Sequence, residues 1–404
     1  MAVKGRNSAT SSRTKARTAA KRAEAAKASG QATDKSGALP FKAAVLRQAS
    51  GPFTIESLTL DQPRADEVLV KLVATGVCHT DMAVRDRPDT PTPSILGHEG
   101  AGIVEKIGAN VRKVVPGDHV VLTLMSCGRC KFCLRGEPCY CQRQYPLNFS
   151  CRREDGSVSA HSHDGDVCNH FFGQSSFGTH TLANERNVVK VPKSVKLELL
   201  GPLGCGIQTG AGAVMNSLKV KGGDSFACFG TGSVGLAAIM AAHAIGATTI
   251  IAVDIVESRL RMAKRLGATH VINAKKVDPV TEITKITGGQ GLDYALDTSG
   301  AVPVFDQAVA ALGVRGTYGF VTAGNTPART FDARRFMGRG QRMMGILEGD
   351  AVPDLFIPYL IELYQQGRFP FDKLITFYSM RQINRAFDDS HHGKTIKPVI
   401  RMDA

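Results

Sequence analysis

The segment that most constrains the fold of this chain is a glycine-rich turn between an apolar stretch and a helix-like stretch. It reads SFACFGTGSVG from Ser225, and its glycines have the spacing G-x-G-x-x-G. The first glycine permits a tight turn, the second lets the backbone approach a pyrophosphate, and the third allows a helix to pack closely on a strand. The pattern predicts a dinucleotide site formed by Gly230, Thr231, Gly232, Ser233, Val234 and Gly235.

An acidic residue ends the next predicted strand, 24 positions beyond Gly230. Asp254 would accept hydrogen bonds from the ribose hydroxyls of the dinucleotide and repel a 2′-phosphate, which favours NAD over NADP. Arg259 follows in the next predicted helix and is a candidate for a position beside the ribose. A solvated helix arginine would produce the same pattern.

Strand-like and helix-like segments alternate throughout this region. The predicted strands are 225–229, 249–253, 270–273, 292–297 and 317–321, and the predicted helices are 235–245, 257–266 and 302–311. Such alternation indicates βαβ units and a parallel sheet. The most apolar stretch, 234–247, is too short for a membrane span and is interrupted by His243, so it is predicted to be a buried helix.

The N-terminal half has a different pattern, which predicts a β-rich domain without a long helix. Its predicted strands are 42–46, 53–60, 67–74, 100–107 and 119–124, separated by glycine and proline. Near the C-terminus we expect a helix at 354–366 and a strand at 397–401 that return to this first domain.

Five of the ten cysteines fall within fifteen residues. Four of them give the spacing C-x2-C-x2-C-x7-C, at Cys127, Cys130, Cys133 and Cys141. Four closely spaced thiolates can close a tetrahedral zinc site with no open position, which is a structural site. Cys139 competes with Cys141 for the fourth place, and spacing does not decide between them. Clustered cysteines in a large chain indicate metal binding rather than disulfides.

A catalytic zinc needs three protein ligands and one exchangeable position. The candidates are Cys78 in GVCHTD, His98 in GHEGAG and Cys205 in GCGIQTG. They are far apart in the sequence, so spacing alone does not establish the site, and a scattered cysteine is more often a small core residue.

The net charge of +14 is concentrated at the N-terminus. Residues 1–40 hold nine lysines and arginines but only two acidic residues, so they carry half of the net positive charge of the chain. With almost no large apolar side chain, this segment is expected to be a disordered extension. An organelle-targeting segment is the alternative to a cytoplasmic location. A nucleic-acid-binding arm is disfavoured because no aromatic residues alternate with the basic ones.

In their order along the chain, these motifs resemble those of the zinc-containing medium-chain alcohol dehydrogenases. The resemblance runs from about Phe41 to the C-terminus. Within that family it is strongest to the aryl- (benzyl-) alcohol dehydrogenases. The closer similarity is carried by FFGQSSFGTH from Phe171, EGDAVPDLFIPYLIELYQQGRFPFDKL from Glu348 and GKTIKPVIR near the end.

The resemblance implies an α/β protein with a GroES-like catalytic domain (41–206), a Rossmann domain (207–346) and a C-terminal segment (347–404) that rejoins the first domain. It implies two zinc ions per chain, one structural and one catalytic, with the catalytic ion on Cys78, His98 and Cys205. The resemblance also implies that Asp81 orients His98 and that Glu99 lies behind the metal. Thr80 would form a hydrogen bond with the alcohol. Lys397 and His79 would contact the pyrophosphate of the cofactor. Homodimers or homotetramers are usual in the family.

One position departs from the better-known liver-type enzymes, in which a histidine five residues after the catalytic cysteine finishes the proton relay. Here that residue is Ala83, so the relay would end through the nicotinamide ribose to water or at His79. The expected reaction is hydride transfer between a primary aromatic or allylic alcohol and NAD, giving the aldehyde.

Two alternatives remain. One is a zinc dehydrogenase of the same fold that acts on another alcohol, a polyol or a formaldehyde adduct. The other is a nucleic-acid-binding protein built on the cysteine lobe and the basic N-terminus. The latter is disfavoured because the lobe lacks an adjoining recognition helix and because Asp254 and the glycine turn would have no role. No membrane partner is expected.

Overall fold

The computed structural model describes residues 37–322 and 330–402. The chain divides into two compact units, Met1–Ala38 and Leu39–Ala404, and the description below concerns the second. The expectations of disorder or targeting for residues 1–40 fall almost wholly outside the described residues. Within the described part, no helix is long and apolar enough to cross a membrane.

The N-terminal half is built on two sheets that are almost entirely antiparallel. Their orders are β4-β1-β2-β7-β8 and β10-β6-β5-β3-β18-β17, with β9 also paired to β3. The strands of this half are β1 (Leu39–Leu46), β2 (Phe53–Leu60), β3 (Glu67–Gly76), β4 (Ser94–Ile95), β5 (Glu99–Ile107), β6 (His119–Leu122), β7 (Ala160–Ser162), β8 (Gly165–Val167), β9 (His180–Asn184) and β10 (Val188–Val191). All five strands predicted here are present, with boundaries that differ by at most three residues.

The helices of this half are short, as the sequence predicts. They are α2 (His79–Arg85), α3 (Lys131–Leu134) and α4 (Gln144–Phe149). Strand β3 pairs with β5, β9 and β18, and its apolar residues are buried along nearly its whole length. A strand covered on both faces has a near-continuous apolar sequence.

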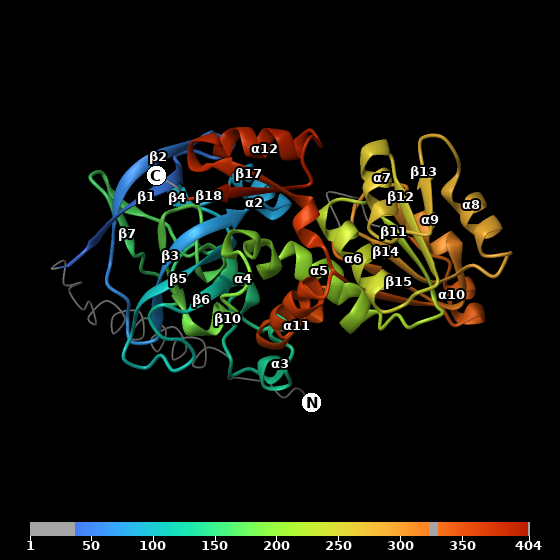
Figure 1. The fold of residues 1–404 in the computed structure, drawn as a ribbon, viewed down its shortest axis with the longest axis horizontal. Helices are drawn as coiled ribbons and strands as arrows, with labels where there is room; N and C mark the ends of the chain where they lie inside the picture. The colour runs from blue at the N-terminus through green and yellow to red at the C-terminus, as the bar shows by residue number, and fades with distance from the viewer. Residues whose placement is uncertain (1–36, 323–329, 403–404) are drawn as a thin grey trace, which may run out of the picture. The chain divides into compact units, whose positions relative to one another are not determined.

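The second half is a six-stranded parallel sheet of order β13-β12-β11-β14-β15-β16. Its strands are β11 (Ser225–Phe229), β12 (Thr249–Asp254), β13 (His270–Asn273), β14 (Leu292–Asp297), β15 (Leu312–Phe320) and β16 (Arg342–Gly345). Its helices are α6 (Ser233–Ala244), α7 (Glu257–Arg265), α8 (Pro279–Ile286), α9 (Val304–Ala311) and α10 (Ala333–Arg339). This order is that of a dinucleotide-binding Rossmann sheet, and Figure 1 shows its strands and helices.

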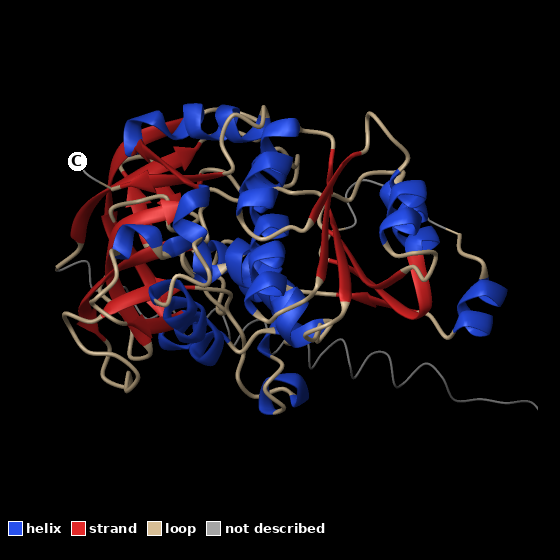
Figure 2. Ribbon diagram, turned by 45° about the vertical axis from the view of Figure 1, so that its right-hand side comes forward, coloured by secondary structure: helices blue, strands red, loops and turns tan. Residues whose placement is uncertain are grey.

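Alternate residues of β11 pack on opposite faces of this sheet. Phe226 and Cys228 join the core that contains α6 and α7, whereas Ala227 and Phe229 join the core that contains α8 and α9. Figure 2 shows helices on both sides of the sheet. The prediction of a buried helix after the glycine turn is confirmed, because most of α6 is buried.

Helix α5 (Gly206–Gly212) precedes the parallel sheet in the sequence. After that sheet, the C-terminal part of the chain returns to the N-terminal half. It contains α11 (Pro353–Gln365), β17 (Ile375–Ser379), α12 (Ile383–His391) and β18 (Lys397–Arg401). Strand β18 pairs antiparallel with β3, with Val399 opposite Gly76, and Val77 N donates to Pro398 O at 2.9 Å. This register brings Lys397 to the segment that precedes α2.

Candidate active site

A cleft of about 610 Å³ is lined by residues of both halves of the fold. The β-rich half contributes the start of α2, and the parallel sheet contributes the glycine turn after β11 and the end of β12. Among the lining residues are Cys78, His79, Thr80, Cys205, Gly230, Gly232, Ser233, Val234, Asp254, Arg259 and Lys397. Most of the predicted site residues therefore meet at one cavity, although they are spread over more than 300 positions of sequence.

Cys78, His98, Cys205 and Glu99 form one cluster next to this cleft. Each offers a ligand atom, and these atoms all lie within 4.8 Å of one another. Cys78 precedes α2, His98 and Glu99 stand at the start of β5, and Cys205 precedes α5. Three elements distant in sequence thus bring two thiols, an imidazole and a carboxylate to one point.

Asp81 organises two members of the cluster. It is fully buried; Oδ2 accepts a hydrogen bond from Cys78 N at 2.9 Å, and Oδ1 lies 2.9 Å from His98 Nδ1. The first contact is half of a capping box that fixes the start of α2. A carboxylate that accepts from Nδ1–H leaves Nε2 with its lone pair free to bind a metal.

The free nitrogen of His98 provides a test of whether a metal fits. Among the described residues, Nε2 is a buried atom without a hydrogen-bond partner. A buried polar atom without a partner costs free energy, and such atoms are rare in native proteins. Because the atoms around it are two thiols and a carboxylate, the donor set fits a zinc ion bound by two sulfurs and one nitrogen.

Glu99 and Lys397 form a buried ion pair within the same cluster. Lys397 Nζ lies 2.9 Å from both carboxylate oxygens and 3.3 Å from Val77 O. Burial raises the pKa of Glu99 to about 7, although Lys397 opposes the shift. The three hydrogens of the ammonium group are all used by these contacts, so contact between Lys397 and a pyrophosphate would require one of them to be released.

The glycine turn has the backbone that its sequence predicts. Gly230 has a positive φ of 91°, and a Cβ at Gly235 would collide with the Gly230 carbonyl oxygen. A Cβ at Gly232, in contrast, would meet no heavy atom within 4 Å in the described part of the chain. The first and third glycines are thus required by the fold itself, whereas the second leaves open space where a bound group can approach the backbone.

Asp254 lies at the end of β12 beside this turn. Its Oδ2 accepts from Thr231 N at 2.6 Å and from Thr231 Oγ1 at 2.7 Å, while Oδ1 accepts from Ile255 N and Val256 N. The carboxylate therefore stabilises the turn as well as lining the cleft. Arg259 lines the cleft too, and its Nε is a buried atom without a hydrogen-bond partner among the described residues.

The positions around Thr80 bear on the proton relay. Thr80 Oγ1 lies 3.7 Å from Cys78 Sγ, and both Thr80 and His79 line the cleft. Ala83 is exposed and is not among the residues that line it. His79, in contrast, is exposed and lines the cleft.

The cysteine-rich lobe forms a second cluster. The sulfurs of Cys127, Cys130, Cys133 and Cys141 lie within 4.8 Å of one another. Cys127 N donates to Cys141 Sγ at 3.2 Å, and backbone N–H groups of Cys133 and Gln142 lower the pKa of Cys130 to about 6. Donors directed at sulfur favour the thiolate, which is the metal-binding form.

Cys139 lies outside that cluster. Its buried thiol donates to Ala351 O at 3.3 Å, and burial raises its pKa. The geometry therefore favours Cys141 over Cys139 as the fourth ligand, a choice that the spacing left open.

Comparison with known proteins agrees with this arrangement. Residues 64–193 match the alcohol dehydrogenase GroES-like domain family, and residues 233–366 match the zinc-binding dehydrogenase family. The chain belongs to the zinc-containing medium-chain alcohol dehydrogenase family. The predicted family and its two-domain fold class are thereby confirmed.

Individual members of this family resemble the chain over most of its length. The geraniol dehydrogenase of Castellaniella defragrans is 43% identical over 89% of this chain and 97% of its own. A benzyl alcohol dehydrogenase structure from Acinetobacter calcoaceticus has a TM-score of 0.87 and 49% identity over 90% of this chain and all of its own. An alcohol dehydrogenase zinc-binding domain protein from Burkholderia ambifaria has a TM-score of 0.89 and 53% identity, over 91% of this chain and 100% of that one.

From the sequence, Phe171, Phe172 and Phe177 are candidates to line a pocket, with simple core packing as the alternative, and Phe149 is not among them. Phe149 and Phe172 both line the cleft, and the ring of Phe172 stacks on His98 with centroids 4.4 Å apart. Phe171 and Phe177 are instead fully buried. Phe172 has a positive φ of 52°, an unusual backbone for a bulky residue that no sequence pattern signals.

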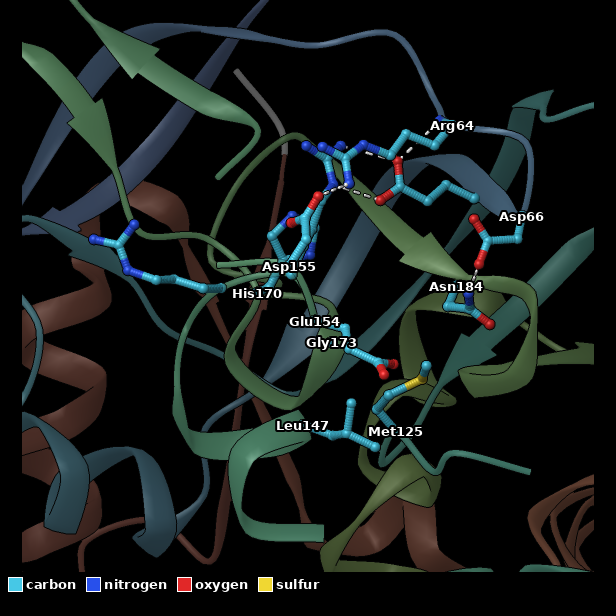
Figure 3. Close-up of a pocket in the computed structure, with 12 residues that line it drawn as sticks. Arg64, Asp66, Met125, Leu147, Glu154, Asp155, His170, Gly173 and Asn184 are labelled. Atoms are coloured by element: carbon cyan, nitrogen blue, oxygen red, sulfur yellow. Dashed lines mark hydrogen bonds and ion pairs between the residues drawn. The ribbon is translucent and has the colours of Figure 1, made fainter. Parts of the chain in front are cut away.

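A second cavity, of about 400 Å³, lies in the β-rich half (Figure 3). Four of its charged side chains form ion pairs with each other: Arg64 pairs with Asp155 at 2.7 Å, and Arg153 with Glu67 at 2.6 Å. Asn184 Nδ2 donates to Asp66, also at 2.6 Å. Because these groups are already paired, this cavity is a weaker candidate for a reaction site than the cleft.

Proposed function

We propose that this chain is a zinc-dependent, NAD-linked dehydrogenase that converts a primary aromatic or allylic alcohol to its aldehyde and catalyses the reverse reaction. The observation that carries the proposal is that the Cys78–His98–Cys205 cluster and the glycine turn meet at one cleft. A metal-bound alcohol and a nicotinamide ring could therefore come into contact there, as hydride transfer requires.

The bound groups would supply the reactive chemistry: zinc as a Lewis acid on the alcohol oxygen, and NAD as the hydride acceptor. Cys78, His98 and Cys205 would hold the catalytic zinc, and Cys127, Cys130, Cys133 and Cys141 a structural one. The turn Gly230–Gly235 would receive the pyrophosphate, with Asp254 accepting hydrogen bonds from the ribose. The positive end of α6 would favour the phosphates.

The remaining residues would position the substrate and its proton. Thr80, which lines the cleft, would accept the hydrogen bond of the alcohol hydroxyl, and His79, an exposed residue of the same cleft, would pass the proton to water. Phe149 and Phe172 offer ring surfaces for the flat carbon skeleton of a benzylic or allylic alcohol. We also propose the domain limits 41–206, 207–346 and 347–404, with residues 1–40 as an extension.

Relatives favour an aromatic or allylic substrate, but one alternative has support among them. The probable S-(hydroxymethyl)glutathione dehydrogenase 1 of Schizosaccharomyces pombe is 38% identical over 90% of this chain. That name denotes a large, charged substrate, whereas the apolar wall of Phe149 and Phe172 suits a small hydrophobic one. A substrate panel therefore separates the two activities.

The test is NADH formation by the zinc-loaded protein with benzyl alcohol, geraniol and S-(hydroxymethyl)glutathione. Cys205→Ser should abolish turnover, whereas Cys168→Ala, a buried cysteine that does not line the cleft, should retain it. Turnover with benzyl alcohol or geraniol that depends on Cys205 would support the proposal. Preference for the glutathione adduct, or turnover that survives Cys205→Ser, would contradict it.

A further inference from the structure

The turn Glu348–Asp350 connects the two cysteine clusters, and nothing in the proposed reaction uses it. On one side, Glu348 Oε1 lies 3.4 Å from the sulfur of Cys205. On the other, Tyr140 of the cysteine-rich lobe donates its hydroxyl to Asp350 Oδ1 at 2.6 Å, and Cys139 donates to Ala351 O. The turn thus contacts a residue of the catalytic cluster and two residues of the lobe.

Glu348 itself is a buried carboxylate without a positively charged partner. It is 8% exposed, and within the described part of the chain it forms no ion pair. Its Oε2 accepts from Gln208 Nε2 at 3.2 Å and from Thr209 Oγ1 at 3.4 Å, both on α5, the helix that begins after Cys205. A buried carboxylate with only neutral donors is costly unless a cation lies nearby.

The carboxylate of Glu348 lies next to one of the proposed ligands of the catalytic zinc. It lies against a sulfur that would bind zinc as a thiolate, and two negative groups in contact in a buried site repel each other strongly. A zinc ion on Cys78, His98 and Cys205 would offset this repulsion. Glu99, a carboxylate within the cluster, is already neutralised by Lys397, so the negative charge of Glu348 would remain to act on the metal.

The backbone around Glu348 is held in an unfavourable conformation. Glu348, Gly349 and Asp350 have φ values of 51°, 65° and 50°. A left-handed conformation is unfavourable for a non-glycine residue and persists only where surrounding contacts maintain it. Such contacts are present: Asn216 Nδ2 donates to Gly349 O at 3.1 Å, and the Tyr140 hydroxyl donates to Asp350.

We propose that Glu348 is a positioning carboxylate of the catalytic metal centre, held against Cys205 by the strained turn and by the cysteine-rich lobe through Tyr140. This inference rests on the proposed function, because it requires a metal on Cys78, His98 and Cys205. Through Cys205, the negative charge of Glu348 increases the affinity of the site for a divalent cation. The lobe thereby contributes to metal retention at the catalytic site.

The first experiment measures zinc retention. Wild type, Glu348→Gln and the control Glu362→Gln, an exposed glutamate of α11 that does not line the cleft, are dialysed against a chelator, and zinc per chain is followed over time. Glu348→Gln keeps the size of the side chain and removes its charge, so it should lose one zinc about 10- to 100-fold faster, the usual effect of groups that support metal ligands. The structural zinc should be retained at the wild-type rate.

The second experiment detects a change at the metal rather than a general loss of stability. Cobalt(II) is introduced at the catalytic site, and the sulfur-to-cobalt and d–d absorption bands are recorded. Glu348→Gln should shift these bands, and Glu348→Asp, which restores the charge on a shorter stem, should recover part of the zinc retention. Tyr140→Phe alters the turn from outside the site and should accelerate zinc loss less than Glu348→Gln does. If Glu348→Gln does not fold, the rate of zinc loss from Tyr140→Phe tests whether the turn supports the metal site.

The failures of the two proposals are distinguishable. Equal zinc retention and identical cobalt spectra in wild type and Glu348→Gln would overturn this inference and leave the proposed function intact. If Glu348→Gln is insoluble, wild-type zinc retention in Tyr140→Phe would overturn it instead. If Cys205→Ser does not change the zinc content of the protein, the proposed function fails, and this inference fails with it.

Discussion

Lys397 Nζ lies 2.9 Å from both carboxylate oxygens of Glu99, and neither side chain is more than 2% exposed. The pair joins β18, near the C-terminus, to β5 of the N-terminal half, directly beside Cys78 and His98. Its strength depends on both partners, because each alone would be an unpaired charge in a buried site.

Lys397→Met should therefore destabilise the protein by about 3–5 kcal/mol, the usual cost of removing one partner of a buried pair. The double variant Lys397→Met/Glu99→Gln should recover part of that loss, because it leaves no buried charge without a partner. The measurement is thermal unfolding of wild type, both single variants and the double variant. Strictly additive effects would show that the two residues do not stabilise each other.

The glycine turn allows a paired prediction. Gly235→Ala should lower stability by about 1–3 kcal/mol, because its Cβ collides with the Gly230 carbonyl oxygen. Gly232→Ala should leave the melting temperature of the cofactor-free protein unchanged, because its Cβ meets open space. It should nevertheless weaken NADH binding by about tenfold or more, equivalent to about 1.4 kcal/mol, where the pyrophosphate would lie. NADH titration and thermal unfolding check both variants, and unchanged NADH affinity in Gly232→Ala would refute the proposed pyrophosphate position.

Asp254→Asn should change cofactor preference. The carboxylate repels a 2′-phosphate, and removing a like charge from such a contact should raise the ratio of kcat/KM with NADP to that with NAD by about tenfold or more. Because Asp254 also accepts hydrogen bonds from Thr231, Ile255 and Val256, some stability is lost as well. The ratio is measured in one preparation, so it is independent of the folded fraction. An unchanged ratio would argue against contact with the ribose.

The two cysteines that compete for the structural site should behave differently. Cys141→Ser should release one zinc per chain and lower the melting temperature, because the binding free energy of a structural zinc contributes to folding. Cys139→Ser should keep that zinc, because the Cys139 thiol donates to Ala351 O and is not part of the four-sulfur cluster. The measurement is the zinc content per chain of each variant. Loss of zinc from Cys139→Ser but not from Cys141→Ser would make Cys139 the fourth ligand instead of Cys141.

His170 provides a prediction on pH dependence. Burial and the nearby Arg153 lower its pKa to about 3, and its Nε2 lies 3.0 Å from Ser159 Oγ. In the unfolded chain the pKa is about 6.5, so the unfolded state binds more protons and stability falls as the pH drops below about 6.5. This residue alone should remove about 2 kcal/mol between about pH 7 and about pH 5. His170→Gln should lose less stability over that range, as measured by thermal unfolding, and equal pH dependence in both proteins would contradict the assignment.

The elements that the sequence predicted are those governed by local patterns. The strands 225–229, 270–273 and 292–297 have the predicted boundaries, because strand periodicity and flanking turn residues lie within a few positions of each other. The glycine turn is equally local, since Gly230 and Gly235 are constrained by their own backbone and by each other. Spacing alone could not identify Cys78, His98 and Cys205 as members of one site. Their resemblance to the motifs of a known family predicted it.

Other features had no local signal. Glu348 reaches Cys205 across 143 positions, and the contact of Lys397 with Glu99 spans 298. Phenylalanines at 149, 171, 172 and 177 look alike in the sequence, yet Phe149 and Phe172 line the cleft and the other two do not. Cys139 and Cys141 are two positions apart in the sequence. Only the structure shows that the Cys141 sulfur joins the four-sulfur cluster, whereas the Cys139 thiol donates to a backbone carbonyl.

The sequence by itself determined the family, the parallel sheet with its dinucleotide turn, and the chemical types of the candidate ligands. These depend on residue identity, periodicity and short spacings, which a linear chain contains in full. Only the tertiary structure decided which of these groups meet, which charges neutralise each other and which carboxylate lies against which sulfur. Such contacts depend on how separate strands and helices pack, and packing is set by the sum of many weak contacts along the whole chain rather than by any one segment.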